Sequence, residues 1–188
     1  INTLDTISKA YAGSEQRAYT LTGPYGVGKS TIALYLSILL SPKKAEREYA
    51  QTKLTEADKS LKTFAERFDV KKGWKIIRHV CGLEAPANAI LISFYNAFSI
   101  EYSIAKVKKY TDEQCLQEIK TTLENAPKKQ DGVLFLLDEM GKALDYQSRN
   151  NKDLHLFQAL ADISQQAKIP VVLIGFLHQS FSDYAKNK

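Results

Sequence analysis

The hydrophobic and polar positions along this chain follow two different periods. Short, continuous apolar runs bounded by polar or turn-forming residues predict buried strands at 18–22, 74–80, 133–137 and 171–177. Between them, apolar residues recur every three or four positions, which predicts helices at 3–12, 30–40, 43–69, 86–107, 112–125 and 142–168, the last with an interruption at 148–151. The alternation of strands and helices indicates an α/β domain of three layers around a largely parallel sheet.

The length of 188 residues fits a single domain that spans 1–188 and is large enough to bury a core. The charged helical stretch at about 43–72 reads as an insertion between the first two strands. The caps expected for the later helices are Asp112 and Asp153. The chain begins at Ile1 rather than Met, so we expect an excised or processed piece of a longer protein.

The stretch after the first strand carries the clearest chemical signal. Gly23 to Ser30 reads G-x-x-x-x-G-K-S, placed between a predicted strand and a predicted helix. Glycines let a backbone turn tightly and approach phosphates closely, while successive N–H groups and the following helix N-terminus attract negative charge. Lys29 can reach the outer phosphates, and the Ser30 hydroxyl can ligate Mg²⁺. The expected nucleotide-binding residues are Gly23, Pro24, Tyr25, Gly26, Val27, Gly28, Lys29, Ser30 and Thr31.

Two carboxylates follow the third apolar run, at Asp138 and Glu139. The carboxyl ends of parallel strands meet at one edge of a sheet, so these groups should lie beside the phosphate loop. Asp138 would complete a magnesium site with Ser30, and Glu139 would activate a water molecule for attack on a phosphate. The alternative is that the two acids only mark the start of the next helix.

These motifs resemble those of a known family. Gly23–Thr31 is similar to a Walker A motif and Val133–Glu139 to a Walker B motif with an additional Glu, as in the ASCE division of P-loop ATPases, which includes AAA+, origin-recognition-like and STAND proteins. The resemblance implies a P-loop fold, bound ATP and Mg²⁺, and catalytic roles for Lys29 and Glu139. It also aligns 174–178 with the sensor-1 strand, which implies that His178, or its neighbour Gln179, senses the terminal phosphate.

The sequence departs from that family in several places. Sensor 1 is usually Asn, Thr or Ser rather than His. The spacing between Lys29 and Asp138 is long, and the insertion at 43–72 accounts for much of it. No fifth strand, lid, sensor-2 arginine or arginine finger is assignable within 188 residues. We therefore expect a core truncated before its lid, with the effector domains absent and an arginine finger supplied by another copy or a partner subunit. Local similarity at 138–142 and 177–181 suggests large bacterial ATPases of phage-defence or DNA-processing systems.

Charge and composition add candidates for partners. The net charge is +5, and lysines cluster at 43–44, 71–75, 106–109 and 128–129, near element ends. These clusters are either solvated loop tips or a surface for nucleic acid. No apolar stretch reaches the ~20 residues of a membrane span, and the first twenty residues do not resemble a signal peptide. The two cysteines, Cys81 and Cys115, lie far apart in sequence and lack metal-ligand spacing. We take a reducing cytoplasm as the default location.

The function expected from the sequence is therefore the ATP-binding and hydrolysing core of a larger ATPase, whose nucleotide state rearranges attached domains, with DNA as a candidate substrate. One alternative is a nucleotide-locked signalling or structural module with negligible turnover. Others are a small-molecule phosphotransferase and, less well supported by the spacing around Asn151, a GTPase. Arg78 and His79 also lie near the carboxyl end of a strand, where structural roles compete with ligand binding.

Overall fold

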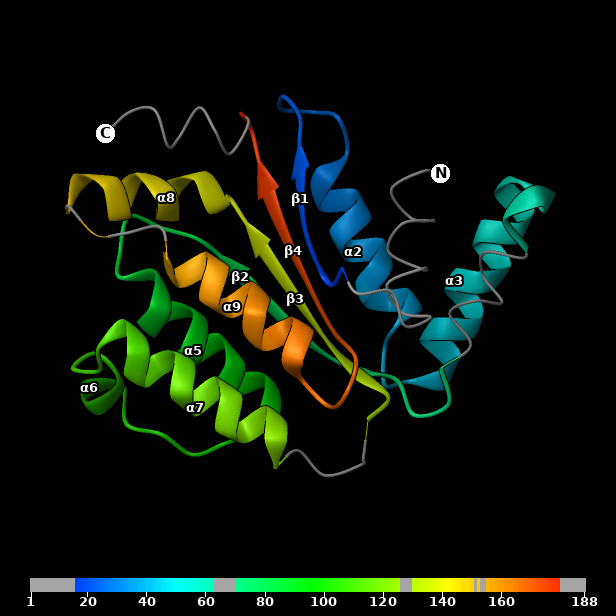
Figure 1. Ribbon diagram of the computed structural model, residues 1–188. Helices are drawn as coiled ribbons and strands as arrows, with labels where there is room; N and C mark the ends of the chain where they lie inside the picture. Colours follow the sequence, from blue (N-terminus) through cyan, green and yellow to red (C-terminus); the bar gives the residue numbers. More distant parts are fainter. Residues whose placement is uncertain (1–15, 63–69, 126–129, 151, 153–154, 180–188) are drawn as a thin grey trace.

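The computed structural model describes residues 16–62, 70–125, 130–150, 152 and 155–179. Within them, β1 (Ala18–Thr22), β2 (Trp74–Val80), β3 (Gly132–Asp138) and β4 (Val171–Leu177) form a sheet in the order β1-β4-β3-β2. All neighbouring strands are parallel (Figure 1). The predicted strands are confirmed to within one residue. Because β4 lies between β1 and β3, its carboxyl end lies between the glycine-rich loop and the acidic pair.

Helices cover both faces of the sheet (Figure 1). On one face lie α2 (Lys29–Leu39) and α3 (Lys44–Ala57), followed by the short 3₁₀ turn η1 (Lys59–Leu61). On the other lie α5 (Pro86–Phe98), α7 (Asp112–Glu124), α8 (Met140–Arg149) and α9 (His155–Gln166), with the short α6 (Ile104–Val107) between α5 and α7. The expected α/β architecture with a parallel sheet is confirmed, and α3 confirms helix in the expected insertion.

The continuously apolar sequence of β3 is explained by helices that cover both of its faces. Phe135 and Leu137 pack with α5, α8 and α9, whereas Leu134 and Leu136 pack with α2 and α3. All four side chains are almost fully buried. Successive strand residues point to opposite faces, so a strand covered on both sides has no polar face. The strand becomes polar only at Asp138, where it leaves the core.

Two local predictions are wrong. The helix expected at 86–107 ends at Phe98, because Ser99 adopts a left-handed conformation (φ 55°) and the amide of Ile100 donates to the carbonyl of Tyr95. The cap of α7 is Thr111 rather than Asp112: its hydroxyl accepts from the amide of Gln114, whose side chain accepts from the amide of Thr111.

The predicted helix at 3–12 and the predicted cap Asp153 lie outside the described residues. None of the helices in the described part of the chain has the length and apolar character needed to span a membrane.

Candidate active site

The loop between β1 and α2 has the backbone that its glycines predict. Gly26 and Gly28 have φ of 83° and 86°, which L side chains rarely adopt. A Cβ atom at either position would meet no atom of the described residues within 4 Å, so among them the loop faces open space on this side. The amide of Gly23 donates to the carbonyl of Leu177 at 3.1 Å. The start of the loop is therefore fixed directly to the end of β4.

Lys29 is the first residue of α2, and its ammonium group folds back over the loop. Nζ donates to the carbonyl of Gly23 and, at 2.8 Å, to that of Pro24. It also lies 3.4 Å from Nδ1 of His178. One positive charge is thus held at the centre of the site, within reach of both the loop and the end of β4.

Ser30 and Asp138 come together across 108 positions of sequence, as predicted. Ser30 Oγ donates to Asp138 Oδ2 at 3.2 Å, while Oδ1 accepts from the amide of Glu139 at 2.9 Å. The carbonyl of Asp138 accepts from the amide of Cys81, so the carboxylate stands on a firmly paired strand end. A hydroxyl and a carboxylate at this distance are a donor set suited to Mg²⁺, which takes few protein ligands and keeps several waters.

No group of three or more His, Cys, Asp or Glu side chains suited to a metal occurs among the described residues. A multi-ligand zinc or iron centre of such side chains is therefore not formed within them. The Ser30–Asp138 pair offers oxygen donors only, the ligand type that hard cations such as Mg²⁺ prefer.

Glu139 occupies a strained position directly after the strand. Its backbone is left-handed (φ 53°, ψ 32°), and it precedes the first turn of α8. Oε1 lies 3.1 Å from Nε2 of His178, and Oε2 lies 3.5 Å from Nζ of Lys142. Burial alone would raise the pKa of this carboxyl group, but the hydrogen bond and charge of His178, with Lys142, outweigh it and hold the pKa below its usual value. Glu139 is therefore ionised at neutral pH.

His178 links three parts of the site. Its two ring nitrogens face Lys29 and Glu139, and its ring stacks on Tyr25, with centroids 3.7 Å apart and planes at 26°. The sequence analysis placed Tyr25 in the loop but missed this contact, because residues 153 positions apart give no local signal. It also missed Lys142, which was detectable as a cation one helical turn after Glu139.

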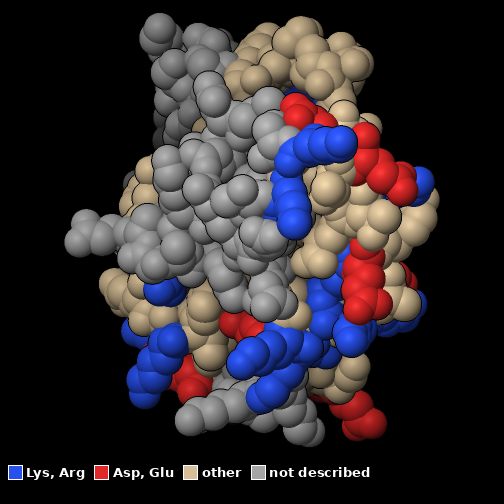
Figure 2. Space-filling model, turned by 90° about the vertical axis from the view of Figure 1, so that its right-hand side faces the viewer, with Lys and Arg blue, Asp and Glu red and all other residues tan. Residues whose placement is uncertain are grey.

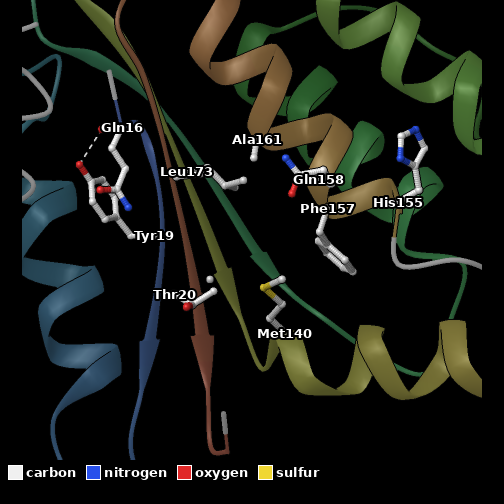
Figure 3. Close-up of a pocket in the computed structure, with 11 residues that line it drawn as sticks. Gln16, Tyr19, Thr20, Met140, His155, Phe157, Gln158, Ala161 and Leu173 are labelled. Carbon is white, nitrogen blue, oxygen red and sulfur yellow. Dashed lines mark hydrogen bonds between the residues drawn. The ribbon is translucent and has the colours of Figure 1, made fainter. Parts of the chain in front are cut away.

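These side chains line one small cavity of about 260 Å³ at the carboxyl edge of the sheet. Its lining residues are Tyr25, Gly26, Gly28, Lys29, Ser30, Thr31, Asp138, Glu139 and His178. A larger cavity of about 600 Å³ lies between β1, β4 and α9, with Met140 at its border and Phe157 and Leu173 in its walls (Figure 3). The described residues around that larger cavity include no Lys, Arg, Asp or Glu, whereas Lys29, Asp138 and Glu139 line the smaller one.

The remaining candidates do not line the small cavity. Arg78 donates through Nε to Ser37 Oγ at 3.0 Å, and His79 Nδ1 lies 3.0 Å from Ser93 Oγ. Burial lowers the pKa of His79. Cys81 and Cys115 are buried, and burial raises the pKa of both thiols to about 12, which leaves them unreactive. The structural interpretation of these four residues is favoured.

No protein-family model matches the chain, and no characterised protein matches it significantly.

Proposed function

We propose that this chain is the ATP-binding and hydrolysing core of a larger ATPase of the P-loop type, similar to the AAA+ and STAND proteins of the ASCE division. The observation that carries the proposal is the convergence of Lys29, Ser30, Asp138, Glu139 and His178 in one cavity at the carboxyl edge of a parallel sheet. These residues come from three separate segments of the chain. Ligands of open α/β sheets bind at this edge.

The parts of the site have distinct tasks in this proposal. The loop amides and Lys29 bind the phosphate chain through hydrogen bonds and charge. Ser30 and Asp138 hold Mg²⁺, which when bound would neutralise charge on the outer phosphate oxygens. Glu139, ionised at neutral pH, accepts a proton from the attacking water. His178, between Lys29 and Glu139, senses whether the terminal phosphate is present.

The second candidate is a nucleotide-locked module with negligible turnover. One observation favours it: the Glu139 carboxylate is engaged by His178 and Lys142 rather than by the Ser30–Asp138 pair. A base held in this way must be released before it can accept a proton. Measured turnover separates the two candidates, because both require the same nucleotide-binding residues.

The test uses two matched substitutions. Lys29→Ala removes the central cation and should abolish tight binding of ATP with Mg²⁺, measured by calorimetry. Glu139→Gln keeps the size of the side chain, so ATP should still bind, while phosphate release falls by about 10²–10⁴-fold. An unchanged affinity of Lys29→Ala for ATP would rule out the assignment of this loop as a phosphate-binding loop. Equal turnover in Glu139→Gln and the parent chain would remove Glu139 as the base.

A partner completes the proposed site. No arginine is among the described residues that line the small cavity. An arginine finger supplied in trans raises the rate by about 10³–10⁵-fold. We therefore expect residues 1–188 alone to bind ATP but to hydrolyse it very slowly, with activity gained on homo-oligomerisation or on binding a partner subunit. Turnover at about 1 s⁻¹ or faster by a dilute monomer would contradict this expectation. A cytoplasmic location belongs to the same proposal.

A further inference from the structure

Two of the four lysine clusters meet at the edge of the sheet opposite the candidate active site. Lys43 ends the loop between α2 and α3, Lys44 is the first residue of α3, and the loop before β2 carries Lys71 and Lys72. Arg47, only 5% exposed, ties them together: Nη1 donates to the carbonyl of Ser41 at 2.6 Å and Nη2 to that of Lys71 at 3.1 Å. A buried guanidinium thus fixes the two basic loops against each other, at the amino-terminal ends of the strands.

The second loop is also fixed to the strand beside it. The amides of Lys72 and Gly73 both donate to Oδ2 of Asp131, and the amide of Asp131 donates to the carbonyl of Gly73. The Oδ2 atom of this carboxylate is therefore held by the backbone of the loop, whose residues Lys71 and Lys72 are exposed. Lys75 follows on β2. The backbone that carries these lysines is therefore fixed by hydrogen bonds to Asp131.

Acidic neighbours reduce the positive charge only in part. Lys43 pairs with Glu46 and Lys44 with Glu48, but the two lysine side chains remain 76% and 79% exposed. Exposed pairs of this kind contribute little, and a phosphate can replace the carboxylate. Figure 2 shows the side of the molecule that carries α3, on the right in Figure 1. Basic side chains gather over its lower part, with fewer acidic ones among them. The surface therefore attracts a polyanion.

A cavity of about 580 Å³ opens beside these lysines. Lys72 and Lys75 lie at its border, Phe98 and Ile100 supply apolar wall, and Asn125 and Gln130 supply amide groups. Lys75 Nζ lies 5.8 Å from the centroid of the Phe98 ring. The Nε2 atom of Gln130 is buried and has no hydrogen-bond partner in the described part of the structure. A buried donor without a partner is costly, so turning the Gln130 amide into the cavity, toward an acceptor atom on a ligand, would be favourable.

We propose that this cavity and its lysines bind single-stranded nucleic acid, with one unstacked base in the cavity and the phosphates on Lys71, Lys72 and Lys75. The volume lies in the range of small-molecule sites and suits one nucleoside. An aromatic ring, amide groups and flanking cations are the combination by which proteins hold unpaired bases. A base inside a duplex cannot enter such a cavity without leaving its stack. The lysines outside the cavity extend the contact along a strand, beyond one mononucleotide.

The proposal is tested on the 188-residue chain by its affinity for a labelled, single-stranded, mixed-sequence oligonucleotide. Fluorescence anisotropy measures this affinity without ATP, over a series of salt concentrations. Lys71→Ala/Lys72→Ala should weaken binding about tenfold or more at low salt and lower the slope of log K against log salt by about 1.4. Lys108→Ala/Lys109→Ala removes the same charge at another exposed cluster, and should change neither by a comparable amount. Equal effects of the two double variants on affinity and on its salt dependence would indicate general charge attraction and would overturn the proposed binding site.

Two further comparisons test the base and the class of ligand. Gln130→Met removes the buried donor at similar length, and should weaken binding about fivefold while leaving the salt slope unchanged. The same sequence as a duplex, a free mononucleotide and polyglutamate should each compete poorly. Equal competition by duplex or polyglutamate, or full competition by the mononucleotide, would overturn the proposal, as would unchanged binding in Gln130→Met. Circular dichroism confirms that each variant is folded.

Discussion

Two glycines with nearly the same backbone angle should respond differently to alanine. Gly28, in the candidate phosphate loop, has φ 86°, and Gly73, before β2, has φ 80°. Alanine in this conformation costs about 1–2 kcal/mol at either position. At Gly28 the new methyl group meets no atom of the described residues within 4 Å, whereas at Gly73 it lies less than 3.0 Å from both Pro42 Cα and the Ser41 carbonyl oxygen, closer than real Cβ atoms approach. Both of the atoms it meets are backbone atoms, so they cannot turn aside.

The expected losses in unfolding free energy follow from this difference. Gly28→Ala should lose about 1–2 kcal/mol, and Gly73→Ala about 2–5 kcal/mol, because overpacking adds about 1–3 kcal/mol to the strain. Urea unfolding measures both values. Gly82→Ala is the control, since the nearest described atoms to its methyl group belong to the Glu84 side chain and lie at ordinary contact distances.

ATP affinity should show the opposite order. The methyl group of Gly28→Ala points into the open side of the loop, where the phosphates would lie, so affinity should fall about tenfold or more. Gly73→Ala, at the other edge of the sheet, should bind ATP normally at temperatures where it is folded. Similar destabilisation by Gly28→Ala and Gly73→Ala, or unchanged ATP affinity in Gly28→Ala, would refute the reasoning.

Two other residues give separate predictions. Tyr25→Ala removes the ring that stacks on His178, and should lower kcat for ATP hydrolysis with a smaller effect on ATP affinity, whereas Tyr25→Phe should keep both; equal kcat in the two variants would contradict a positioning role. Burial holds the pKa of His79 below 6.5, so the unfolded chain takes up a proton that the folded chain does not as pH falls below 6.5. The free energy of unfolding should therefore fall over that range more steeply in the parent chain than in His79→Asn, and parallel curves from urea titrations would contradict it.

The strands were predictable because burial on both faces leaves a direct mark on the sequence. In β3, each residue from Val133 to Leu137 packs against one of two helical layers, and no polar residue interrupts the run. The end of α5 left no comparable mark. Ser99 carries the left-handed turn that a glycine usually provides, so the pattern of apolar positions continued through a break in the chain.

The candidate site was predictable where a motif fixed the residues and not where only the fold brings them together. Lys29, Ser30 and Asp138 follow from the spacing of two motifs and from the rule that strand ends share an edge. The stacking of Tyr25 on His178 depends on β4 lying next to β1, which no short pattern encodes. The meeting of the two lysine clusters likewise depends on Arg47, whose position in a charged helix gives no indication that it is buried.

The left-handed backbone of Glu139 sets the stability of the fold against the proposed activity at that position. A glutamate in that conformation costs about 1–3 kcal/mol, whereas glycine adopts it freely and asparagine more readily than most residues. A library of position 139 sorted only for heat tolerance should therefore enrich Gly and Asn. The same library sorted for phosphate release should return Glu. Stability and activity would therefore favour different residues at position 139, so the most stable variant and the most active variant would differ there.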